Sequence, residues 1–250
     1  MLPELIRIGP ITIYSYGAMI SIAIVLGLFL AWRQASREGI RPEVIVDFTL
    51  YAALAGLVGS RVLYVALHWS DYAGRPGAIL GLGQGELQGL SIHGALLGGV
   101  LVGIFFARRY RLSFWRLADV YARPLAIGMG IGRVGCFLGG CCYGQLTGGG
   151  WGCTTLYAPG LRHPSQLYET ALLVILFVFL SWYMTKPRAS GQLFAVFLAG
   201  YAVMRFLAEI YRDSIRVTGP LSLAQLVSVA LLVAGLILWR LRRGRPADQA

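Results

Sequence analysis

Residues 128–144 read GMGIGRVGCFLGGCCYG, and they lie in the middle of a chain that otherwise consists mostly of long apolar runs. The stretch combines seven glycines with Arg133 and three of the four cysteines of the protein. Glycine is a poor helix former, and a charged side chain is costly in lipid. We therefore expect that no long apolar helix forms here and that the interruption serves function.

The composition around this stretch is typical of an integral membrane protein. The 250 residues have a mean hydropathy of +0.66, and 57% of them are hydrophobic and 13% charged. Soluble domains contain about 25% charged residues. Several apolar runs also reach the roughly 20 residues that cross a bilayer. The composition predicts one all-α, polytopic membrane domain over residues 1–240, followed by a short polar tail over 241–250. A very apolar soluble helical protein is the less favoured alternative.

The apolar runs predict about seven transmembrane helices. The fourth is the least helix-like of them, because it contains Pro124 and many glycines. The candidate spans cover residues 13–32, 44–67, 90–107, 117–138, 166–184, 191–211 and 221–239.

Basic residues follow the first, third, fifth and seventh spans, whereas the longer loops 68–89 and 139–165 contain fewer of them. Because Lys and Arg gather in cytoplasmic loops, this pattern predicts an N-terminus outside and a C-terminus in the cytoplasm. The formal net charge of +11 is scattered over short loops rather than gathered in one stripe. No nucleic-acid partner is expected from such a distribution.

Three predicted spans carry an arginine inside an apolar run, namely Arg61, Arg133 and Arg205. Each such charge costs roughly 2.5–3.5 kcal/mol on insertion scales. In the sixth span, Tyr201 and Glu209 flank Arg205 at i−4 and i+4, and Arg212 follows at i+7. Helical periodicity places all four on one side of the helix. A structural Arg205–Glu209 pair is one interpretation. Because the arginines outnumber nearby acids, the other is a bound phosphate, such as a phospholipid headgroup.

His93, in the run SIHG at the start of the third span, is the strongest general acid–base candidate, because histidine ordinarily titrates near neutrality. A hydrogen-bonded or capping histidine is the alternative. The run RHPSQLYE over residues 162–169 enters the fifth span, where a polar helix cap before Pro164 is expected. Glu169 then lies near the positive end of the helix dipole. Tyr16 lies at the outer end of the first span, where aromatic belts occur.

The four cysteines fall in or just after the quoted stretch, on the predicted outer side. An even number of cysteines in an oxidising compartment predicts one or two disulfides, and a disulfide that closes the loop 139–165 is the favoured interpretation. The spacing C-x4-C-C-x10-C matches no zinc pattern, so no metal is expected, although a metal site and a reactive thiol are alternatives. The cysteines are Cys136, Cys141, Cys142 and Cys153.

The chain resembles the bacterial prolipoprotein diacylglyceryl transferase family in motifs that run through most of its length. The family signature GRxxNFxNxExxG has two asparagines and a glutamate where this chain has Cys136, Gly139 and Cys141, but Phe137 and Gly144 are kept. The matching motifs are YG at 16–17, GSR at 59–61, SIHG at 91–94, D-x4-P at 119–124, GR at 132–133, RHPSQLYE at 162–169 and Y-x3-R-x3-E at 201–209.

This resemblance implies a multi-pass enzyme of the bacterial inner membrane with seven spans and no cofactor. It implies transfer of the diacylglyceryl group of phosphatidylglycerol to the lipobox cysteine of a preprolipoprotein signal peptide, with release of glycerol phosphate. Arg133 and Arg205 would hold the phosphate, and His93 would take the proton of the attacking thiol. The other residues that would bind or orient the substrate are Tyr16, Arg61, Gly144, Gln166, Tyr201 and Glu209.

Three further hypotheses stay open at this point. The first is a related membrane enzyme that moves a phospholipid-derived group to another acceptor. The second is a phospholipid-binding protein without catalysis. The third is a membrane thiol oxidoreductase that uses the pair Cys141–Cys142, although the chain lacks C-x-x-C.

Overall fold

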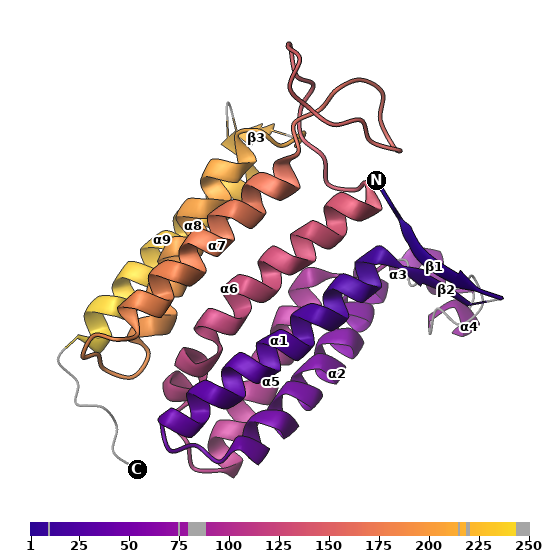
Figure 1. The fold of residues 1–250 in the computed structure, drawn as a ribbon. Helices are drawn as coiled ribbons and strands as arrows, with labels where there is room; N and C mark the ends of the chain where they lie inside the picture. Colours follow the sequence, from indigo (N-terminus) through magenta and orange to yellow (C-terminus); the bar gives the residue numbers. More distant parts are fainter. Residues whose placement is uncertain (10, 75, 80–88, 215, 219–220, 244–250) are drawn as a thin grey trace. The chain divides into compact units, whose positions relative to one another are not determined.

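The computed structural model describes residues 1–9, 11–74, 76–79, 89–214, 216–218 and 221–243 (Figure 1). These residues form nine helices and two short β-hairpins. They divide into two compact units, which are called unit 1 and unit 2 below. Unit 1 comprises residues 1–34 and the described residues from 118 onward, and unit 2 comprises residues 35–117.

Seven of the helices in the described part of the chain have 18 residues or more, and each coincides with one of the seven predicted spans. Six of these are also long and apolar enough to cross a membrane, which supports a polytopic helical membrane protein. These six are α1 (Ser15–Arg37), α2 (Pro42–Leu67), α5 (Ile92–Arg109), α7 (Ser165–Tyr183), α8 (Gln192–Glu209) and α9 (Leu223–Arg242).

The remaining long helix, α6 (Phe114–Gly139), runs through residues 128–139 of the glycine-rich stretch, so a long helix does form there. The expectation concerned a long apolar helix, and α6 is not among the six helices that are both long and apolar enough to cross a membrane. Four of its five glycines, Gly128, Gly130, Gly132 and Gly135, lie against other helices of unit 1. A Cβ atom on Gly135 would be 3.1 Å from the Cβ atom of Met19 in α1. Gly128 and Gly132 share that face of α6, at i−7 and i−3 from Gly135. Small residues let helices approach closely in membranes, and this packing outweighs the low helix propensity of glycine.

Asp119 of α6 is 3% exposed and binds the N-terminal end of α8. Its carboxylate accepts hydrogen bonds from the backbone N–H groups of Gly191 and Phe194, both at 2.7 Å. The first N–H groups of a helix lack partners within the helix, and a carboxylate there also interacts favourably with the helix dipole. This contact fixes α8, which carries Arg205, against α6, which carries Arg133.

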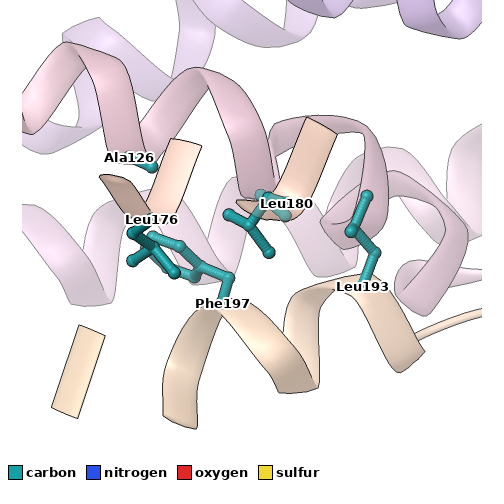
Figure 2. Close-up of a cluster of buried hydrophobic side chains, with 6 residues drawn as sticks. Ala126, Leu176, Leu180, Leu193 and Phe197 are labelled. Carbon is teal, nitrogen blue, oxygen red and sulfur yellow. The ribbon is translucent and has the colours of Figure 1, made fainter. Parts of the chain in front are cut away.

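An apolar core lies between α6, α7 and α8. Leu180 and Leu193 at its centre are fully buried. In Figure 1, α7, α8 and α9 lie side by side in unit 1. Figure 2 labels Ala126 of α6, Leu176 and Leu180 of α7, and Leu193 and Phe197 of α8.

In unit 2, α2 and α5 pack backbone against backbone. A Cβ atom on Gly94 would clash with the carbonyl oxygen of Gly59, and one on Gly98 would clash with that of Ala55. The GSR and SIHG motifs therefore meet through their glycines. Two short helices, α3 (Trp69–Tyr72) and α4 (Pro76–Ile79), follow α2.

Two short hairpins were not expected from the sequence. The N-terminal hairpin pairs β1 (Glu4–Ile8) with β2 (Ile11–Tyr14), and the backbone N–H of Leu2 donates to the carbonyl of Leu138 at 3.0 Å. The segment before the first span is thereby joined to the C-terminal end of α6. The second hairpin pairs β3 (Arg216–Thr218) with β4 (Leu221–Ser222), and it leads into α9.

Candidate functional site

Four helix ends meet at one end of unit 1 (Figure 1). Because α6 to α9 follow one another as antiparallel helices, the C-terminal ends of α6 and α8 lie beside the N-terminal ends of α7 and α9. Ion pairs to Glu169 of α7 connect this helix to α6 and to α8, and a hydrogen bond between Ser222 and Glu209 connects α9 to α8. Five charged residues of α6, α7, α8 and the turn after α8 are gathered here, namely Arg133, Glu169, Arg205, Glu209 and Arg212.

Glu169 lies at the centre of this charged cluster and is 2% exposed. Its Oε2 atom is 2.7 Å from Nε of Arg133, and its Oε1 atom is 3.0 Å from Nη1 of Arg212. Nη1 of Arg205 is 3.8 Å from the same Oε1 atom. From the sequence, Glu169 was expected only to interact with the dipole of the helix that it enters, so its role as the centre of an ion-pair cluster was missed. A useful signal was its place one turn inside an apolar helix, where an unpaired carboxylate is costly.

Glu209 is the second acid of the cluster, and it forms the ion pair with Arg205 that was one of the two interpretations of the sequence. Nη1 of Arg205 is 2.6 Å from Oε2 of Glu209, and Nε of Arg212 is 3.8 Å from that atom. The hydroxyl of Ser222 donates to Oε1 at 2.9 Å. Ser222 is also the N-cap of α9, in a capping box with Gln225. The same serine therefore begins α9 and holds the carboxylate.

The cluster has three guanidinium groups and two carboxylates, and so a charge excess of one. The side chains of Arg133, Arg205 and Arg212 keep 24%, 15% and 18% exposure, whereas both carboxylates are almost fully buried. Each guanidinium has five N–H donors in a planar fork, so donors are left for an anion. Arginine forks match phosphate oxygens in pairs, and this geometry suits a phosphate.

A cavity of about 370 Å³ lies beside the cluster, and Arg212 is in its wall. The other residues that line it are Cys141, Cys142, Tyr143, Tyr157 and Asp213.

Tyr16 and Tyr201 were both predicted to bind substrate. Tyr201 is partly buried one turn before Arg205. The charges of Arg205 and Arg133 interact electrostatically with its phenol group. Tyr16 is 49% exposed at the start of α1 and packs beside Gly135 of α6. Both tyrosines belong to unit 1, and their contact with a substrate stays a prediction.

The run RHPSQLYE binds the loop that follows α6, and none of its side chains caps α7. Pro164 is the N-cap of α7, no side chain caps that helix end, and the expected polar cap was therefore wrong. Instead, Gln166, 1% exposed, donates from Nε2 to the carbonyl of Cys141 at 2.6 Å. The hydroxyl of Ser165 donates to the carbonyl of Cys142 at 3.0 Å. These polar side chains fix the position of the residues that follow α6.

Gly144 lies where two other segments approach the loop after α6. Its N–H donates to the carbonyl of His163 at 3.0 Å. A Cβ atom on Gly144 would lie 2.5 Å from the carbonyl oxygen of Tyr211 and 2.7 Å from that of His163. Glycine is needed here because there is no room for a side chain. These contacts show that Gly144 positions the loop after α6 against the segments of His163 and Tyr211. Direct binding of substrate by Gly144 stays a prediction.

Arg61 and His93 belong to unit 2. Nε of Arg61 donates to the carbonyl of Ile79 at 2.8 Å, and Nη1 donates to that of Gly89 at 3.1 Å. Its guanidinium carbon also lies 5.4 Å from the ring centroid of Tyr72. His93 is exposed in the first turn of α5. Arg61 thus binds the backbone that follows α2, and the roles of both residues at the substrate stay predictions.

A helix-ending turn brings three of the cysteines together. Gly140, with φ of +78°, follows the last residue of α6. The N–H of Cys141 donates to the carbonyl of Cys136, and the N–H of Gly140 to that of Phe137, both at 3.1 Å. This pair of bonds is the Schellman motif. The Sγ atoms of Cys136, Cys141 and Cys142 consequently lie within 4.8 Å of one another.

All four cysteines are free thiols in the part of the chain that the structure describes. Cys153 is not in the three-thiol group. Its backbone pairs with Arg162. Hydrogen bonding with Cys136 and with Cys141 lowers the pKa of the Cys142 thiol, and the charge of Arg212 lowers this pKa further. The favoured disulfide, which closes the loop 139–165, stays a prediction.

The fold and the site define a polytopic helical membrane protein with a phosphate-compatible arginine cluster where its helices end. The chain belongs to the prolipoprotein diacylglyceryl transferase family, because the model of that family matches residues 3–241. This confirms the resemblance seen in the sequence motifs.

Relatives in three bacteria match almost the whole chain, and each is named phosphatidylglycerol–prolipoprotein diacylglyceryl transferase. The protein of Geobacillus kaustophilus is 38% identical, over 96% of this chain and 92% of its own length. The protein of Trichormus variabilis is 37% identical, over 98% of this chain and 91% of its own length. The protein of Bacillus cereus strain G9842 is 35% identical, over 95% of this chain and 91% of its own length.

Proposed function

We propose that this protein transfers the diacylglyceryl group of phosphatidylglycerol to the lipobox cysteine of preprolipoproteins and releases glycerol phosphate. The family and the names of the relatives support this reaction. The structural observation that carries it is the group of three arginines held by two buried carboxylates. Such a cluster has the charge and the donors to bind the phosphodiester of the lipid.

In the proposed reaction, the thiolate sulfur of the lipobox cysteine attacks the glyceryl carbon that is bonded to the phosphate oxygen. A carbon–sulfur bond forms, the carbon–oxygen bond breaks, and the phosphate oxygen keeps the electron pair. The leaving group gains negative charge, which Arg133, Arg205 and Arg212 stabilise. Because Glu169 and Glu209 already hold these arginines, little reorganisation is needed as the charge develops.

The thiolate is the nucleophile, so the thiol proton must be removed. We assign this step to His93, whose ordinary pKa suits a general base near neutral pH. Its exposure in the first turn of α5 supports the assignment, since a general base must reach the proton that it accepts. Tyr16, Arg61, Gln166, Gly144 and Tyr201 are the further residues proposed to bind or orient the lipid.

We further propose that α6 also crosses the membrane, as the fourth of seven spans along the chain, and that the protein lies in the inner membrane with its N-terminus outside. With 26 residues, α6 has a length of about 39 Å, enough for a hydrocarbon core of about 30 Å. Seven crossings place the basic loops in the cytoplasm, as the positive-inside rule requires. The arginine cluster then lies near the outer face, where a secreted preprolipoprotein arrives. The proposed membrane domain is residues 1–240, and most of the tail 241–250 lies outside the described residues.

The test is complementation of a bacterial strain depleted of its own transferase, together with an assay of glycerol phosphate release from phosphatidylglycerol and a lipobox peptide. The wild-type chain should restore growth and release glycerol phosphate, whereas His93→Ala and Arg133→Ala should do neither. A well-expressed, inserted wild-type protein that binds the lipid but never releases glycerol phosphate would overturn the proposal. Release that needs an acceptor other than the lipobox cysteine would overturn the assigned acceptor.

A further inference from the structure

The three-thiol group formed by Cys136, Cys141 and Cys142 has the geometry of a metal site. All three Sγ atoms lie within 4.8 Å of one another. Zinc–sulfur bonds of about 2.3 Å place the sulfurs of a tetrahedral site about 3.8 Å apart. Side-chain rotations that move each sulfur by less than about 1 Å would therefore close the site around an ion. We propose that these three cysteines bind one Zn²⁺ ion.

The backbone holds two of these thiols in place before any ion arrives. In the Schellman motif, residues C3 and C″ of the helix end contact each other, and here they are Cys136 and Cys141. Gly140 supplies the left-handed residue that this turn needs. Cys142 itself has φ of +61°, a conformation that is uncommon outside glycine. The spacing C-x4-C-C therefore forms a site only because α6 ends as it does.

Neighbouring side chains also hold the backbone of two of the three cysteines, Cys141 and Cys142, in position. Gln166 and Ser165 hold the carbonyl groups of Cys141 and Cys142 with bonds of 2.6 and 3.0 Å. Metal ligands on such supported backbone are preorganised.

A metal ion accounts for all three thiols, whereas one disulfide between any two of them leaves the third unpaired. Three protein ligands leave a fourth position open on Zn²⁺, as in catalytic zinc sites. Cys141 and Cys142 line the cavity of about 370 Å³, which gives an ion a way in and leaves room for a water or another ligand.

The charge around the site suits an anionic metal–thiolate group. Three thiolates and one Zn²⁺ ion together have a charge of −1. Arg212 lines the same cavity, and the cluster to which it belongs has a charge excess of one. The two charges would offset each other across the cavity wall. The bound ion would join the end of α6 to the loop that carries Gly144 and would so support the arginine cluster.

The experiment uses the full-length protein in detergent, reduced and kept free of oxygen. Cd²⁺ and Co²⁺ serve as probes, because thiolate-to-metal charge transfer gives each an ultraviolet absorption. We expect one ion per chain with this absorption. Cys136→Ser, Cys141→Ser and Cys142→Ser should each lower the affinity at least tenfold. Cys153→Ser is the matched control and should bind as the wild type does.

A second measurement needs no variant and therefore does not depend on whether the variants fold. Alkylation of the reduced wild-type protein should label four thiols without Zn²⁺ and only Cys153 with one equivalent of Zn²⁺. The proposal is overturned by binding of less than half an ion per chain. Equal loss of binding in Cys153→Ser, or Zn²⁺ that leaves all four thiols open to alkylation, would overturn it as well.

Discussion

Nε of Arg133 lies 2.7 Å from Oε2 of Glu169, and this ion pair joins the last turns of α6 to the first turns of α7. Oε1 of Glu169 also accepts a hydrogen bond from Nη1 of Arg212 at 3.0 Å, so one buried carboxylate holds two arginines from different parts of the chain. Glu209 holds Arg205 in the same way within α8. The donors that we assign to the lipid phosphate are thus positioned by acids that do not need to touch the substrate themselves.

Glu169→Gln should destabilise the protein and abolish transfer. The substitution removes the carboxylate charge between two arginines, and breaking a buried ion pair typically costs about 3–5 kcal/mol. Thermal unfolding in detergent should show a clearly lower midpoint, and no glycerol phosphate should be released. Asp213→Asn is the matched control, because the carboxylate of Asp213 is 55% exposed in its pair with Arg162. An exposed pair contributes about 0–1 kcal/mol. Equal unfolding midpoints for the two variants would contradict the central role of Glu169.

Arg205→Lys should keep the fold but slow the reaction. Lysine keeps the positive charge next to Glu209 but loses the planar fork that binds two phosphate oxygens at once. The loss of one charge-assisted hydrogen bond, about 1.5–3 kcal/mol, corresponds to a fall in kcat/KM of about 10- to 160-fold. The rate of glycerol phosphate release measures it. Arg108→Lys, on an exposed side chain at the end of α5, should leave the rate unchanged. A wild-type rate in Arg205→Lys would show that the fork of Arg205 does not bind the leaving phosphate.

Gly144→Ala should weaken the joint between the loop after α6 and the end of α8. The added methyl group would lie 2.5 Å from the carbonyl oxygen of Tyr211 and 2.7 Å from that of His163, and both of these oxygens belong to the backbone. Overpacking of this kind typically costs about 1–3 kcal/mol. We expect a lower unfolding midpoint together with lower activity. Gly148→Ala is the control, since that glycine is exposed and a Cβ atom there meets nothing within 4 Å. Its stability should stay within about 0.5 kcal/mol of the wild type. If Gly144→Ala is as stable and as active as the wild type, the close contact of Gly144 with the carbonyl oxygens contributes to neither stability nor activity.

The sequence predicted the helices well because hydrophobic run length determines a membrane span. All seven predicted spans coincide with long helices. Residues 128–138 gave two conflicting signals, because they lie in the fourth predicted span, 117–138, but their low helix propensity argued against a helix. Gly128, Gly132 and Gly135 were expected to disfavour a helix, but they provide the face on which α6 packs against α1. Packing between distant segments is not visible in local propensity.

The candidate site was predicted only in part, for a similar reason. Periodicity within one helix correctly paired Arg205 with Glu209. The partner of Arg133 is Glu169, 36 positions away by sequence numbering, and only tertiary structure brings the two together. The three-thiol group was also missed, because C-x4-C-C converges only around a Schellman turn with Gly140 at positive φ.

Gly140→Ala should separate the thiols of Cys136 and Cys141. Gly140 has φ of +78°, and an L-residue in the left-handed region costs roughly 1–2 kcal/mol. The turn should relax, and the affinity for Cd²⁺ should fall at least tenfold. Gly139→Ala is the adjacent control: this residue ends α6, has no positive φ and would place its Cβ atom in open space. Ultraviolet titration of both variants with Cd²⁺ measures the difference. If the two bind Cd²⁺ equally well, the helix-ending turn does not organise the site, and the thiols meet for another reason.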